Sequence, residues 1–147
     1  MSYKMSRQRA VVSAIVLAGA LGIVVGCASM SMSSQQIVLS GSNEVPPVTT
    51  SASGTGTVTI NPDRTVSASI TVTGMTATAS HIHEAAAGAN GAVIVPFTKT
   101  GDNTFAAAEG AKLTESQYAS YKAGNLYVNV HSAKNPGGEV RAQLKGN

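Results

Sequence analysis

Apolar and polar residues alternate along most of the chain beyond residue 36. From Val66 to Thr73 each apolar residue is followed by a serine or threonine, and the stretch from Thr57 to Ile60 alternates in the same way. The turn residues Asn61-Pro62-Asp63-Arg64 separate the two runs. A period of two is typical of a strand with one buried face, so these runs predict a β-hairpin. The same pattern predicts further strands at Ile37–Ser40, Ala79–Glu84, Ala92–Thr98, Thr104–Ala108, Leu126–Ser132 and Glu139–Lys145.

One stretch departs from this alternation and predicts a short helix from Glu115 to Lys122. Thr114 before it and Gln117 three positions later form a capping-box pattern, and Gly124 is a typical residue for closing a helix. Eight short strands separated by Gly, Asn and Pro predict an all-β fold. We expect an antiparallel, Greek-key-like β-sandwich with this helix, near residues 115–122, packed on one end.

The first 26 residues have the pattern of an export signal. Three basic residues precede an apolar run from Ala10 to Val25, which is too short for a typical membrane-spanning helix. The run ends in Val24-Val25-Gly26-Cys27, which resembles a bacterial lipobox and predicts lipidation of Cys27. An uncleaved anchor and simple secretion are the alternatives. We expect a signal peptide at 1–26, a flexible tether at 27–36 and one domain at 37–147.

Removal of the signal changes the charge of the chain. Three of its ten basic residues lie in the signal and all seven acidic residues lie beyond it, so the mature protein is nearly neutral. No basic patch remains that would favour nucleic acid as a partner.

The predicted lipid on Cys27 places the expected location of the protein at the cell envelope. In a Gram-negative cell, Ala28 and Ser29 after the cysteine favour the outer membrane, on its periplasmic side or at the surface. The protein or envelope partner stays open.

The three histidines of the chain fall in two short motifs. Alternation puts His81 and His83 on the strand face opposite Ile82, and it puts His131 on the polar face of the strand Leu126–Ser132, together with Tyr127 and Asn129. The last two predicted strands are joined only by the turn-rich stretch at 133–138, so we expect them to pair directly. Glu139, Arg141 and Gln143 would then share the same polar face.

Two interpretations of these histidines stay open. If the first motif joins this sheet, His81, His83 and His131 would form a three-histidine site for copper or zinc. Glu84 and Glu139 would be a fourth ligand or partners that orient a ring, and Asn129 and Arg141 would lie around the site. Alternatively, the histidines are structural and only hydrogen-bond strand ends and the 133–138 loop together. For Arg141 and Glu139 we expect an ion pair or a cross-strand contact.

Three ordered motifs resemble the chordin-type domain, abbreviated CHRD. They are LSGSNEVPPVTTSASGTGTVTI, SHIHEAAAGANGAVIVPF and LYVNVHSAKNPGGEVRAQL, and they span about residues 37–144. The chain departs from the pattern at Ala85–Ala87, where a glycine is expected. The resemblance implies an extracytoplasmic β-sandwich module, found in exported bacterial proteins and in animal chordin, with no established catalytic activity.

The same stretch is distantly similar to copper-zinc superoxide dismutase, a sandwich related in shape to immunoglobulin domains. The similarity fails for the chemistry, since that family needs more histidines than three and a disulfide that the single cysteine cannot form. We therefore expect an envelope module with a binding or structural role and no catalysis. Metal binding by the three histidines is the alternative, and a three-histidine zinc enzyme is a minor one.

Overall fold

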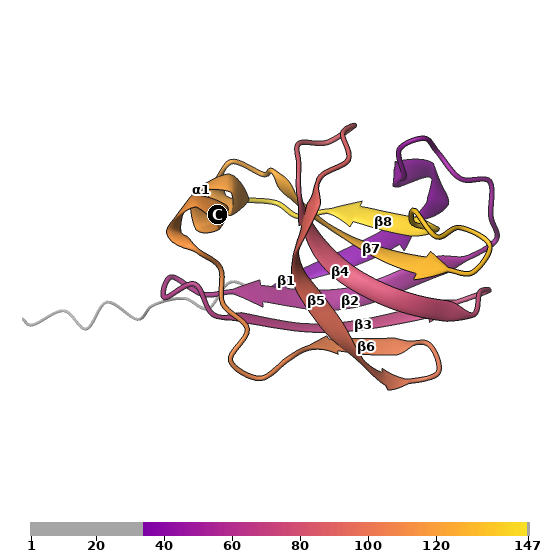
Figure 1. Ribbon diagram of the computed structural model, residues 1–147, viewed down its shortest axis with the longest axis horizontal. Helices are drawn as coiled ribbons and strands as arrows, with labels where there is room; N and C mark the ends of the chain where they lie inside the picture. The colour runs from indigo at the N-terminus through magenta and orange to yellow at the C-terminus, as the bar shows by residue number, and fades with distance from the viewer. Residues whose placement is uncertain (1–33, 147) are drawn as a thin grey trace, which may run out of the picture.

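Eight antiparallel strands close into a barrel in the computed structural model of this chain, which describes residues 34–146 (Figure 1). Around the barrel the order of strands is β1-β2-β3-β6-β5-β4-β7-β8, and β8 meets β1 again. The elements are β1 (Ser34–Ser40), the 3-10 helix η1 (Gly41–Asn43), β2 (Ser53–Ile60), β3 (Val66–Thr73), β4 (Ala77–Glu84), β5 (Ala92–Gly101), β6 (Thr104–Ala107), α1 (Glu115–Lys122), β7 (Leu126–Ser132) and β8 (Val140–Gln143).

The closed barrel shows that the predicted β-sandwich is wrong, although the all-β class and the helix are confirmed. The sheet closes because β3 pairs with β6 and because Ser40 of β1 pairs with Arg141 of β8. Alternation along a strand identifies its buried face. It does not distinguish one sheet closed on itself from two sheets packed face to face, because both bury one face of each strand.

Each predicted strand is present, and the differences lie at the ends. The first strand begins at Ser34, so residues 34–36 of the predicted tether belong to β1. The strand β2 begins at Ser53 and includes two glycines that break its alternation. At Gly56 a Cβ atom would lie 2.5 Å from Ile70 Cδ1, so glycine allows β2 and β3 to pack closely there.

The barrel interior is an apolar core. Ile82, Val128 and Ile70 have no exposed surface, and α1 adds the buried side chain of Tyr121. The helix has the predicted bounds and the predicted capping box: Thr114 Oγ1 accepts from the Gln117 amide at 3.2 Å, and Gln117 Oε1 accepts from the Thr114 amide at 2.8 Å. The apolar positions of the strands therefore define the inside of the barrel, and the polar positions define its outer face.

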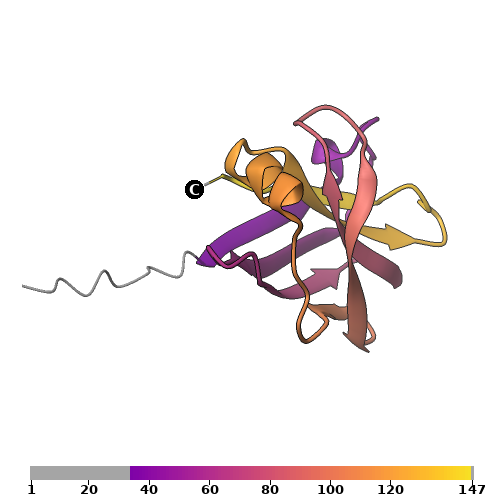
Figure 2. The same ribbon diagram turned by 60° about the vertical axis from the view of Figure 1, so that its left-hand side comes forward.

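Loops fold over part of that outer face. In Figure 2 the β4–β5 loop and the segment between β1 and β2 lie side by side at the top of the barrel. A hydrogen bond of 2.6 Å from Asn90 Nδ2 to the Val45 carbonyl joins them. Beneath these loops, the outward side chains of Tyr127, Asn129 and Arg141 are almost fully buried. A polar layer is thus enclosed between the barrel wall and its loops.

The predicted signal peptide, the lipidation residue Cys27 and the tether up to residue 33 lie outside the described residues. Within residues 34–146, none of the helical segments has the length and apolar character needed to cross a bilayer.

Candidate metal centre

The barrel brings the three histidines together on its outer face. The strand β4 pairs with β7 so that His81 lies opposite Asn129, His83 opposite Tyr127 and Ala79 opposite His131. Ile82, between the first two histidines, points into the core with no exposed surface. The predicted parity of both strands and the predicted pairing of β7 with β8 are confirmed.

The three imidazoles lie close enough to hold one metal ion. One nitrogen from each ring lies within 4.8 Å of the other two, and His81 Nδ1 is 3.0 Å from His131 Nε2. Nitrogens bound to one tetrahedral zinc ion at 2.0–2.1 Å would lie roughly 3.3–3.5 Å apart. To take that geometry, the widest separation between two nitrogens would close by up to roughly 1.5 Å and the 3.0 Å pair would move slightly apart.

Backbone carbonyls determine which ring nitrogen of His83 and of His131 keeps a lone pair. His131 Nδ1 lies 2.9 Å from the Pro136 carbonyl, and His83 Nδ1 lies 3.0 Å from the Gly91 carbonyl. A carbonyl only accepts, so both Nδ1 atoms donate a proton and both Nε2 atoms keep a lone pair when the ring is neutral. The Nε2 atom of His83 is buried and has no hydrogen-bond partner. This is the arrangement by which proteins orient histidine ligands of a metal.

Burial favours neutral rings in the cluster. Burial, followed by the charges of His131 and His83, lowers the pKa of His81 to about 4. Burial also lowers the pKa of His131, although its hydrogen bond to Pro136 opposes the change. Imidazole must be neutral to bind a metal, so His81 and His131 are in the required state at neutral pH.

The two glutamates proposed as a fourth ligand accept hydrogen bonds from serine and threonine hydroxyls instead. Glu84 Oε1 accepts a hydrogen bond of 2.5 Å from Ser120 of α1. Glu139 accepts from Thr50 at 2.7 Å and from Ser132. Burial acts to raise the pKa of Glu139, but these hydrogen bonds outweigh it and hold the pKa below its usual value. In the described part of the chain, the ligands that converge are the three imidazoles.

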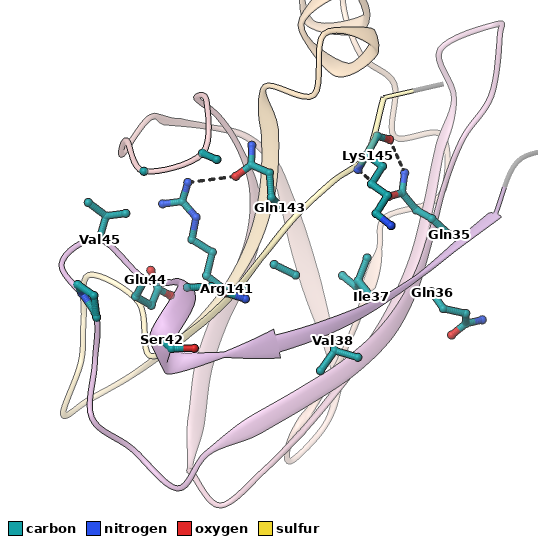
Figure 3. A pocket seen from close by; sticks show the side chains of 15 residues that line it. Gln35, Gln36, Ile37, Val38, Ser42, Glu44, Val45, Arg141, Gln143 and Lys145 are labelled. Carbon is teal, nitrogen blue, oxygen red and sulfur yellow. Dashed lines mark hydrogen bonds between the residues drawn. The ribbon is translucent and has the colours of Figure 1, made fainter.

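The hydrogen bonds of Arg141 go to residues other than Glu139, the ion-pair partner that the sequence analysis expected. Arg141 instead donates to the Ala89 carbonyl at 2.9 Å, to Asn90 Oδ1 at 3.2 Å and to Gln143 Oε1 at 3.3 Å, and Figure 3 shows it beside Gln143. The two residues are separated because Glu139 precedes β8, next to the β7–β8 loop, whereas the Arg141 side chain reaches under the β4–β5 loop.

Sequence reasoning missed Glu44, which is 5% exposed and lies near Arg141 and Asn129. Burial raises its pKa to about 7, which the charge of Arg141 and a hydrogen bond from Asn129 only partly offset. Glu44 Oε1 and Asn129 Oδ1 are both buried without a hydrogen-bond partner. The only signal in the sequence was the position of Glu44 inside the motif NEVPPV, which does not reveal which residues it contacts.

A groove of about 820 Å³ lies next to this polar layer, along β1 and β8 (Figure 3). Glu44, Arg141, Gln143 and Lys145 are among its lining residues, and the three histidines are not. Gln35 closes one end of it through hydrogen bonds with the backbone of Lys145. The groove and the histidine cluster are therefore separate features that share Arg141 as a neighbour.

Comparison with known proteins places the whole described barrel in one family. No curated protein and no solved structure matches the chain significantly. The family model described as CHRD domain matches residues 35–144, which runs from β1 past the end of β8 and includes all three histidines. The chain belongs to the CHRD domain family.

Proposed function

We propose that this CHRD domain binds one copper or zinc ion through His81 Nδ1, His83 Nε2 and His131 Nε2. The observation that supports this most strongly is the buried Nε2 atom of His83, which has no hydrogen-bond partner and belongs to a cluster in which one nitrogen of each histidine lies within 4.8 Å of the other two. A buried polar atom left without a partner costs about 1–3 kcal/mol. A purely structural role accounts for the carbonyl contacts of His83 and His131 and leaves this cost unexplained.

The donor set fits both metals. Imidazole nitrogen suits copper and zinc equally, and three histidines with an open position are a known zinc arrangement. The neutral state of His81 and His131 means that protons compete weakly for these two ligands at pH 7. The open position would take water or another small ligand, because Glu84 and Glu139 are held by other residues.

We propose a binding role and no catalysis for this site. The carboxylates of Glu84 and Glu139, the nearest in sequence to the histidines, accept hydrogen bonds from Ser120, Ser132 and Thr50, so neither is a free base for catalysis. Metal-dependent hydrolysis or hydration by the zinc-loaded protein would contradict this part of the proposal and would favour a three-histidine zinc enzyme.

The test is metal titration of the purified protein with copper(I), copper(II) and zinc(II) against competing chelators. One equivalent should bind with high affinity to the wild type, and His83→Ala and His131→Ala should each lose most of that affinity. Ile82→Val is the matched control, because Ile82 lies between two of the ligands on the opposite face of β4. Absence of binding at saturating metal, or stoichiometric binding that both alanine variants retain, would refute the metal site.

We further propose that the domain is exported and held at the envelope by lipid on Cys27. The support is the sequence of residues 1–27: a basic start, an apolar run and Gly26 directly before the only cysteine. Cys27→Ser should move the protein from the membrane fraction to the soluble fraction and block cleavage of the signal. Membrane association that persists in Cys27→Ser would mean that a different anchor holds it.

A further inference from the structure

We infer that Arg141 is a positioning residue for the metal site: it sets the ring of His83 through Tyr127 and through the loop between β4 and β5. This inference rests on the proposed metal binding, but its first test is made on the metal-free protein. Arg141 is 1% exposed; the carboxylate of Glu44 lies near it, but no carboxylate is among its hydrogen-bond partners in the described structure. A buried guanidinium is costly, so the contacts that it makes in return identify its role.

The first connection is a stack of three planar groups. The guanidinium carbon of Arg141 lies 3.3 Å from the centre of the Tyr127 ring. The Tyr127 ring stacks on His83, with 4.8 Å between the ring centres and an angle of 7° between the planes. Because β7 lies between β4 and β8, Tyr127 has His83 on one side and Arg141 on the other. The guanidinium thus fixes the aromatic plane against which the imidazole packs.

The second connection runs through the β4–β5 loop. Arg141 Nη2 donates to the Ala89 carbonyl and Nη1 donates to Asn90 Oδ1, so one guanidinium holds two successive residues. The next residue is Gly91, whose amide donates to Tyr127 Oη at 3.2 Å and whose carbonyl lies 3.0 Å from His83 Nδ1. Arg141 therefore holds the loop directly before the carbonyl that keeps the proton on His83 Nδ1 and the lone pair on Nε2.

Both connections end on the His83 ring, and each sets one of its properties. The stack sets the plane of the His83 imidazole, and the loop sets which nitrogen carries the proton. A residue that only stabilises the barrel would affect neither property once the protein is folded. The protonation pattern of His83 in folded, metal-free protein is therefore a direct measure of positioning by Arg141.

The experiment compares the wild type with Arg141→Met and Arg141→Lys by long-range ¹H–¹⁵N NMR of the histidine rings, followed by zinc titration against a chelator. The wild type should carry the His83 proton on Nδ1. Arg141→Met should show a mixture of both tautomers and zinc binding about 10–100-fold weaker, the effect expected when a partner of a ligand histidine is lost. Arg141→Lys keeps the charge without the planar fork and should lie between the two.

Arg64→Met is the matched control, because Arg64 lies in the β2–β3 turn and its hydrogen bonds are made by its backbone. Asn90→Ala is a second variant at an exposed position; it removes both the Nη1 contact and the hydrogen bond to the Val45 carbonyl, and it should shift the His83 tautomers in a normally folded protein. If Arg141→Met does not fold, Arg141→Lys and Asn90→Ala decide the question.

Folded variants with wild-type His83 tautomers and wild-type zinc affinity would overturn the inference. Loss of the Nδ1 proton preference in the variants, but not in Arg64→Met, would establish it. If the wild type binds no metal, the proposed function fails, and the tautomer measurement still shows whether Arg141 positions His83.

Discussion

The rings of His81 and His131 share one hydrogen bond, with 3.0 Å between Nδ1 and Nε2. Since His131 donates its Nδ1 proton to Pro136, its Nε2 atom is the acceptor and His81 Nδ1 carries the shared proton. A metal ion would occupy the space between the same two nitrogens. His81 would then move its proton to Nε2, so the metal would replace the hydrogen bond between the two rings.

This pair predicts a loss of stability in acid. The unfolded imidazole has a pKa near 6.5 and the pKa of folded His81 is about 4, so the unfolded state binds more protons between these values. The contribution of neutral His81 to the free energy of unfolding is therefore fully present above pH 6.5 and is lost as the pH falls toward 4. Denaturant unfolding of metal-free protein at pH 7, 6 and 5 should show this decrease in the free energy of unfolding. In His81→Gln the free energy of unfolding should depend less steeply on pH. An unchanged slope in both His81→Gln and His131→Gln would contradict this origin.

Glu44 should have the opposite pH dependence. Its pKa is raised to about 7 in the folded protein, above its usual value of 4.5, so the folded state binds more protons between these values. The stabilising contribution of the protonated Glu44 carboxyl is present at low pH and is lost as the pH rises through 7. Glu44→Gln should therefore gain stability relative to the wild type between pH 5 and pH 8, on the order of 1–2 kcal/mol after solvent screening. A difference that stays constant with pH would show that Glu44 titrates normally.

Gly91 should tolerate no side chain. A Cβ atom there would lie 1.8 Å from the Glu84 carbonyl oxygen, so Gly91→Ala must displace the loop whose carbonyl contacts His83. We expect a loss of about 2 kcal/mol or more in unfolding free energy and weaker metal binding. Gly137→Ala is the control, because a Cβ atom there meets nothing within 4 Å. Equal stability of the two variants would mean that the loop adapts.

The capping box of α1 gives a prediction that is independent of the metal site. Thr114→Ala removes the side-chain oxygen that accepts from the Gln117 amide and should cost about 1 kcal/mol in unfolding free energy. Thr76→Ala, at an exposed position just before β4, should cost much less. Metal affinity should be unchanged in both variants, since neither residue contacts the histidines or their partners. Weaker metal binding in Thr114→Ala would show that α1 influences the site.

The sequence predicted the features that depend on local periodicity. The parity of His81, Ile82 and His83 follows from alternation within one strand, and the bounds of α1 follow from Thr114 and Gln117 as a cap. The neighbours of each strand could not be read in this way. The pairing of β3 with β6, and of Ser40 with Arg141, joins residues far apart in the chain, and these pairs distinguish a barrel from a sandwich.

The sequence predicted the three histidines of the candidate site and not the residues that surround them. Two histidines on one face of a strand and a third on the polar face of another strand can be deduced from parity, but the pairing of β4 with β7 that brings them together cannot. The partners of Arg141 could not, because Ala89 and Asn90 contact it through the fold of a loop about fifty residues away. Loop conformation depends on tertiary contacts such as that of Asn90 with Val45, which leave no period in the sequence.

The closure of the barrel also has a consequence for the solubility of the domain at high concentration. An open sheet presents edge strands whose free backbone groups recruit strands from other molecules. Here β1 and β8 meet at Ser40 and Arg141, and Gln35 joins the backbone of Lys145 at the far end of the same seam. If this seam opened, β1 and β8 would become such edges. We therefore expect Gln35, which also donates to Tyr121 Oη, to limit aggregation of the domain by holding the seam closed.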